Sequence, residues 1–132
     1  MSKRTSINPK TVFNSLQHGF SQGLLVEGNR RLLLSGQVGV DADEKTVKGG
    51  IGEQTKKALD NIELLLREAN ASMSDVVMLR IYIAEIARDD QEPIAEALLE
   101  RFPQDPPPSS WIIVSALSEP EWLIEIEAEA IV

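Results

Sequence analysis

The end of the chain alternates apolar and acidic side chains with a strict two-residue period. In the run LIEIEA at positions 123–128, one side holds Ile124, Ile126 and Ala128, and the other holds Leu123, Glu125 and Glu127. Successive side chains of a β-strand point to opposite faces, so this spacing predicts a strand with one face in the core. The opposite face mixes apolar and acidic side chains, a half-buried pattern that fits a sheet whose second face meets another subunit.

Four further strands and two helices are predicted from the rest of the chain. The strands are expected at Phe20–Val26, Arg31–Val40, Asp75–Ile83 and Ser110–Ala116, with the alternating strand extending over Leu123–Ile131. Glu27-Gly28-Asn29 predicts a hairpin turn between the first two strands.

The helices are predicted from three- and four-residue spacing of apolar side chains. The first begins near Ile51 and ends near Asn70, and the second begins at Asp89-Asp90 and ends before Pro103. The side chains expected to be buried are Ile51, Ala58, Leu59, Ile62, Leu65, Leu66 and Ala69 on the first helix, and Ile94, Leu98, Leu99 and Phe102 on the second. The order β-β-α-β-α-β-β predicts an α+β domain with one sheet and both helices on one face.

Length and charge limit the classes of partner. A chain of 132 residues is the size of one domain, here taken as residues 1–132. Its 13 Lys and Arg against 21 Asp and Glu give a net charge of -8, which argues against nucleic acid and against an anionic membrane. No segment is apolar enough for a signal peptide or a membrane span, so we expect a cytoplasmic protein.

The residue types present also argue against a cofactor. The chain has no cysteine and a single histidine, His18. Thiolate metal sites and disulfides are excluded, and a histidine-based metal site or catalytic triad lacks its residues. We therefore expect no metal and no other cofactor.

Five motifs, in this order along the chain, resemble those of the reactive intermediate deaminase (RidA, YjgF-like or endoribonuclease L-PSP-like) family. They are His18-Gly19-Phe20-Ser21-Gln22, Leu34-Ser35-Gly36-Gln37, Gly49-Gly50-Ile51, Asp75-Val76-Val77 and the Ile-Glu-Ile-Glu-Ala run that ends at Ala128. Members of this family hydrolyse enamines and imines. The resemblance implies a chorismate-mutase-like α+β fold that forms homotrimers, with a small-molecule cleft at each subunit interface.

The resemblance also implies which residues line that cleft. Glu125 matches the glutamate that positions or activates the hydrolytic water. The cleft would further include Phe20, Ser35, Gly36, Glu92, Ser109 and Trp111. Without the resemblance, Glu125 and Glu127 are more typical of solvated or interface strand residues, and Trp111 and Trp122 of core or interface anchors.

Four of these positions differ from the family pattern. Ser109 stands where the family has the arginine that binds a substrate carboxylate, Phe20 replaces a tyrosine, Glu92 an asparagine and Trp111 a small residue. Losing a charge-assisted pair costs roughly 1.5–3 kcal/mol, so we expect the cleft to disfavour small anionic 2-imino acids. A neutral, cationic or partly aromatic ligand suits it better, with Trp111 as a stacking or cation–π surface.

Three functions remain open from the sequence. The first is a binding or sensing trimer for a metabolite other than an imino acid. The second is an enamine or imine hydrolase (a deaminase) that acts on a non-standard substrate with Glu125. The third is an interaction protein with a vestigial cleft, and whether Arg80 supplies the missing cation is also left open.

Overall fold

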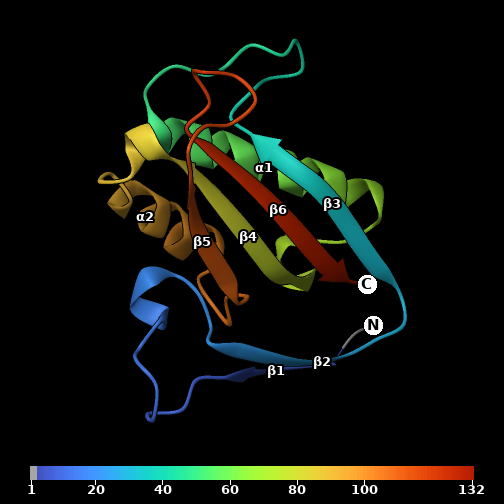
Figure 1. Ribbon diagram of the computed structural model, residues 1–132. Helices are drawn as coiled ribbons and strands as arrows, with labels where there is room; N and C mark the ends of the chain where they lie inside the picture. Colours follow the sequence, from blue (N-terminus) through green and yellow to red (C-terminus); the bar gives the residue numbers. More distant parts are fainter. Residues whose placement is uncertain (1–2) are drawn as a thin grey trace.

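The computed structural model describes residues 3–132 as an α+β domain built around a four-stranded sheet (Figure 1). The strands are β1 (Lys3–Ile7), β2 (Gly23–Glu27), β3 (Arg31–Val38), β4 (Val76–Ala84), β5 (Ser109–Val114) and β6 (Ile124–Ile131). The helices are α1 (Ile51–Glu68) and α2 (Glu92–Arg101), and short 3₁₀ turns lie at η1 (Leu16–His18), η2 (Met73–Asp75) and η3 (Glu85–Ala87). The main sheet has the order β3-β6-β4-β5.

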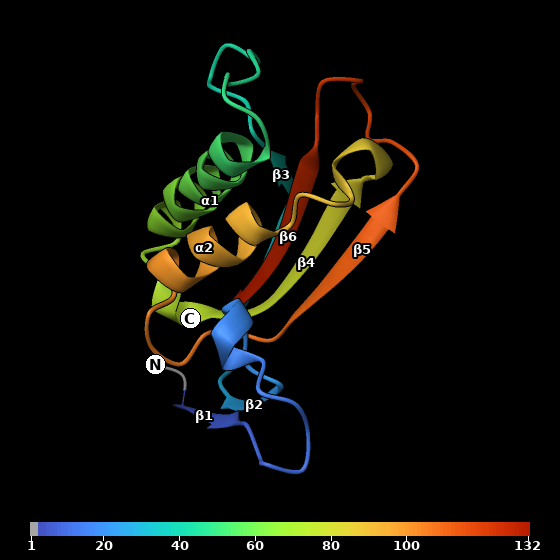
Figure 2. The same cartoon turned by 90° about the vertical axis from the view of Figure 1, so that its left-hand side faces the viewer.

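Both helices cover the same face of the main sheet, as predicted (Figure 2). β6 is antiparallel to β3 and to β4, so β3 and β4 run in the same direction, and β5 is parallel to β4. α1 connects β3 to β4, and α2 connects β4 to β5. Connections between parallel strands have one preferred hand, which places both helices on one side.

The core lies between this sheet face and the helices. The predicted alternation of the last strand is confirmed, because its apolar side chains are at most 2% exposed at Ile124, Ile126 and Ala128. They pack with fully buried side chains from the two helices and from β4, namely Leu59, Ile62, Leu66, Leu79, Ile81, Ile83, Ile94 and Leu98. Two helical leucines predicted to be buried are instead exposed, Leu65 to 38% and Leu99 to 43%, because they lie at the margin of the apolar stripe of each helix.

The predicted hairpin between the first two strands is wrong. β2 pairs antiparallel with β1, a strand that the sequence analysis missed, and the two form a separate two-stranded ribbon. β3 pairs instead with β6. A tight primed hairpin turn needs positive φ, and neither Gly28 nor Asn29 adopts it.

One arginine attaches the ribbon to the domain. The Arg4 guanidinium donates hydrogen bonds to the carbonyl oxygens of Ser74, of Val76 (3.0 Å) and of Asp105 (3.2 Å). These bonds join the N-terminal ribbon to the start of β4 and to the segment that precedes β5. The ribbon therefore has a defined position beside the main sheet, although its strands do not pair with the strands of that sheet.

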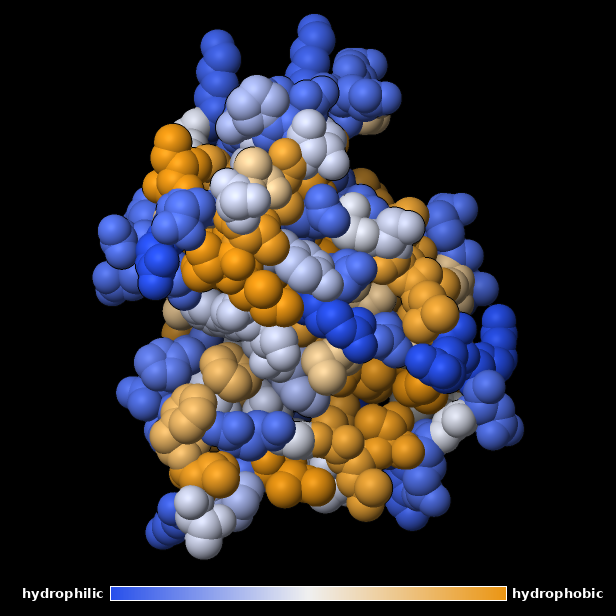
Figure 3. Space-filling view, in the orientation of Figure 1, coloured by the Kyte–Doolittle hydropathy of each residue, from blue (hydrophilic) through white to orange (hydrophobic). Residues whose placement is uncertain are grey.

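The other face of the main sheet has no covering layer in one chain, and we call it the open face. It combines exposed apolar side chains with charged ones, and Figure 3 shows both kinds on the side of the molecule that Figure 1 presents. Leu33 on β3 is 64% exposed and Ile112 on β5 is 40% exposed. Among residues 3–132, no helix has the length and apolar character needed to cross a membrane.

A buried glutamine fixes the loop that leads into β6. Gln54 on α1 is 4% exposed, and its side chain donates to the Glu121 carbonyl and accepts from the Leu123 N–H, both at 2.9 Å. These bonds satisfy two backbone groups that the loop itself leaves free.

We expect Gln54→Ala to lower the free energy of unfolding by about 1–3 kcal/mol, because the two backbone partners lose their hydrogen bonds. Chemical denaturation measures this change. Gln104→Ala, at an exposed glutamine, is the matched control and should have little effect. Equal destabilisation by the two substitutions would contradict the role assigned to Gln54.

Candidate functional site

The pleat of the sheet divides the predicted site residues between its two faces. Ser109 and Trp111 pair with Leu79 and Ile81, which are buried beneath the helices, so both lie on the helix side. Glu125 is opposite Tyr82. Tyr82 is the residue after Ile81 on β4, so its side chain points to the opposite face of the sheet, the open face. Within one chain, Glu125 therefore does not share a cleft with Ser109 and Trp111.

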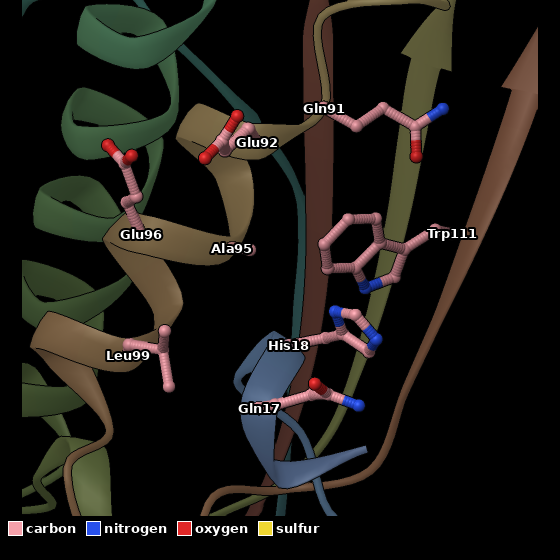
Figure 4. A pocket seen from close by; sticks show the side chains of 8 residues that line it. All are labelled: Gln17, His18, Gln91, Glu92, Ala95, Glu96, Leu99 and Trp111. Carbon is pink, nitrogen blue, oxygen red and sulfur yellow. The ribbon is translucent and has the colours of Figure 1, made fainter. Parts of the chain in front are cut away.

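A pocket of about 480 Å³ lies between η1, α2 and β5, and we call it the helix-side pocket (Figure 4). Trp111 forms its β5 wall, and α2 contributes the predicted Glu92. Sequence reasoning missed the other lining residues, which are Gln17, His18, Gln91, Ala95, Glu96 and Leu99. Glu96 could have been predicted from the sequence, because it lies four residues after Glu92 and such residues are neighbours on a helix surface.

The two remaining predicted residues on this side hold Trp111 in place. The Trp111 indole N–H donates to the Ser109 hydroxyl oxygen at 3.0 Å. The Phe20 ring packs against the indole with centroids 6.2 Å apart, within the range of favourable aromatic pairs. Ser109, where the resemblance implies an arginine, thus accepts the hydrogen bond that anchors the indole.

A second pocket, of about 460 Å³, lies on the open face, and we call it the open-face pocket. Glu125 lines it together with Tyr82, Val114, Ala116, Leu117, Ser118 and Glu127. The Tyr82 hydroxyl donates to Glu127 Oε1 at 2.7 Å, and this bond raises the pKa of Tyr82, which keeps the phenol protonated. Alternation along β4 and β6 could have identified Tyr82 and Glu127 from the sequence.

The predicted Ser35 and Gly36 lie at an irregularity in the pairing of β3 with β6, between Leu34 and Gln37. The Glu125 side chain lies directly against the Gly36 backbone, and a β-carbon on Gly36 would overlap the carboxyl group. Glycine at this position is therefore required for the observed position of Glu125. Ser35 is exposed beside it.

Within one chain, Arg80 does not lie beside Ser109, the position where the resemblance implies an arginine. It lies on the open face, opposite Glu127, whereas Ser109 lies on the helix side. Its guanidinium donates to Glu129 Oε2 at 2.8 Å, and Arg31 donates to Oε1 of the same carboxylate at 2.9 Å. The bond to Glu129 raises the pKa of Arg80, and the two arginines together lower the pKa of Glu129.

The remaining charged groups of the two pockets all have the same sign. The helix-side pocket has Glu92 and Glu96, the open-face pocket has Glu125 and Glu127, and among residues 3–132 no lysine or arginine lines either one. In the same part of the chain, no three histidine, aspartate or glutamate side chains are placed to hold a metal ion. The pockets therefore attract cations and repel anions.

Comparison with known proteins assigns the family. The model of the family described as Endoribonuclease L-PSP matches residues 13–132. A RutC family protein of Pyrococcus abyssi is 37% identical over 112 residues, which is 84% of each chain. The human 2-iminobutanoate/2-iminopropanoate deaminase is 34% identical over 113 residues, which is 85% of this chain and 79% of the human protein.

The chain belongs to the RidA/YjgF family. The fold agrees, because the crystal structure of the Rid family protein YyfB from Yersinia pestis superposes with a TM-score of 0.90 at 37% identity over 98% of both chains. A second member, Rv2704 from Mycobacterium tuberculosis, has a TM-score of 0.68 at 30% identity, covering 98% of this chain and 100% of that one. The resemblance inferred from the motifs is confirmed.

In this RidA/YjgF-family protein, the ion pairs of Glu129 predict a pH-dependent contribution to stability. The two arginines depress the folded-state pKa of Glu129 below its ordinary value of 4.5. The stabilisation by the ion pairs is therefore complete above pH 4.5, and it is lost as the pH falls through the lower folded-state pKa. We expect Glu129→Gln to lower the free energy of unfolding by about 1 kcal/mol at neutral pH, a value typical of partly exposed pairs.

Denaturant titrations of both proteins across the acid range measure this difference. It should vanish at pH values below the folded-state pKa of Glu129, and Glu119→Gln, at an exposed carboxylate, should give no such profile. A difference between wild type and Glu129→Gln that stays constant into acid would contradict the assignment.

Proposed function

We propose that the chain forms a homotrimer in which the open-face pocket of one subunit joins the helix-side pocket of its neighbour. The combined cleft binds a small metabolite that is not a small anionic 2-imino acid. Membership of the family supports a cleft between subunits. The exposed Leu33 and Ile112 on the open face support a covering partner.

The observation that carries the specificity is the charge of the two pockets. Four carboxylates and no lysine or arginine of residues 3–132 line them, and Ser109 hydrogen-bonds Trp111 where the family has its arginine. An anionic substrate would meet no positive partner and would lie near like charges. The same charge, with the net charge of -8, argues against RNA as a substrate.

A second function, hydrolysis of an enamine or imine, is favoured by Glu125. Its carboxyl group lines the open-face pocket beside Gly36, and relatives such as the human protein carry the name deaminase. In this reaction water adds to the imine carbon, the C–N bond breaks and ammonia leaves. Glu125 would accept a proton from the water and return it to the departing nitrogen.

We expect the wild-type protein not to accelerate the hydrolysis of 2-iminopropanoate generated in the assay. Ser109→Arg should restore the carboxylate pair, a charge-assisted bond of about 1.5–3 kcal/mol, and should make hydrolysis measurably faster than the uncatalysed reaction. Release of the keto acid measures the rate. Ser110→Arg, on the same strand but the opposite face, is the matched control and should remain inactive.

Acceleration by the wild-type protein that Glu125→Ala abolishes would overturn the binding proposal and establish the hydrolase. Equal activity of the Ser109→Arg and Ser110→Arg variants would contradict the place of Ser109 in the cleft.

A further inference from the structure

The helix-side pocket has an aromatic wall whose position is fixed. The Phe20 ring packs on Trp111 and on Phe13, with centroids 6.2 and 6.4 Å apart, and Phe13 is 6.5 Å from His18. The bond from the Trp111 indole to Ser109 restrains the indole further. Figure 4 shows the Trp111 and His18 rings beside one another, facing α2 across the pocket.

The α2 side of the pocket carries two exposed carboxylates beside Ala95 and Leu99. Glu92 and Glu96 lie one turn apart on α2, and neither has an ion-pair partner within residues 3–132. The arginines next to and at the end of α2 are already paired, because Arg88 contacts Glu85 at 3.4 Å and Arg101 contacts Asp60 at 2.7 Å. The charge of this side of the pocket is therefore not neutralised inside the described chain.

The two glutamines of the pocket add hydrogen-bond acceptors. The Gln17 amide N–H donates to the Asn14 carbonyl at 2.9 Å, and that of Gln91 donates to the Arg88 carbonyl at 2.8 Å. Their amide oxygens have no donor among residues 3–132. The pocket thus offers carboxylate and amide oxygens around an indole face, a combination that suits a ligand with N–H donors.

We infer that the helix-side pocket binds a primary organic ammonium ion that carries an aromatic or apolar stem. The ammonium group donates to a carboxylate of α2, Glu92 or Glu96, and the stem packs on Trp111, whose face also attracts the cation. A volume of about 480 Å³ is within the range of small-molecule pockets. This inference names the ligand class of the cleft described above and rests on that proposed function, although one chain supplies all the residues that it uses.

Calorimetric titration with three probes that share a phenylethyl stem tests the inference. We expect 2-phenylethylamine to bind at least about tenfold more tightly than 2-phenylethanol and 3-phenylpropanoate, because only the amine makes charge-assisted bonds to the carboxylates. In a Trp122→Phe background, the amine should also change the fluorescence of the remaining tryptophan, Trp111.

Substitutions on α2 locate the charge that recognises the amine. Glu92→Gln or Glu96→Gln should weaken amine binding about tenfold and leave the alcohol unchanged. Glu100→Gln removes the same charge from an exposed site on the same helix outside this pocket, and it should have no effect. Equal binding of the three probes, no binding of the amine, or binding that neither Glu92→Gln nor Glu96→Gln weakens would overturn the inference.

Light scattering on the titrated samples separates this inference from the proposed trimer. A trimer that does not prefer the amine overturns the ligand class alone. A monomer that prefers the amine supports the ligand class and overturns the cleft shared between subunits.

Discussion

The two-residue alternation of β6 is the constraint on which the rest of the domain depends. β6 lies between β3 and β4, so its pleat sets the faces of both neighbours. Its apolar side chains, Ile124 to Ala130, are buried under α1 and α2, and its three glutamates point to the open face. A shift of one residue in this register would bury the three glutamates, which costs far more than any surface contact recovers.

The same pleat separates the two pockets that carry the chemistry. It sends Trp111 toward α2 and Glu125 away from it, so neither pocket alone contains the full set of residues that the family resemblance implies. The proposed trimer, in which each subunit contacts the next head to tail, would unite these unlike surfaces. In that proposal, the exposed apolar side chains of the open face and its carboxylates belong to one interface.

Local patterns in the sequence were sufficient for most of the fold but not for the placement of the site. The spacing on α1 and the alternation of β6 depend on neighbours in the chain; the alternation was confirmed, and the spacing gave the helix and most of its buried side chains but not Leu65. The hairpin prediction was wrong because the Gly28-Asn29 signal is local, whereas the pairing of β2 with β1 and of β3 with β6 joins distant segments. His18 and Gln17 reach α2 only through the tertiary fold, so no periodicity indicated them.

Cross-linking between the two pockets tests the shared cleft most directly. The chain has no cysteine, so Glu92→Cys in the helix-side pocket and Ser118→Cys in the open-face pocket introduce the only thiols. With a short bismaleimide, the double variant should give covalent dimers and trimers on a denaturing gel, and each single variant should stay monomeric. A double variant that also remains monomeric would contradict a cleft built from two subunits.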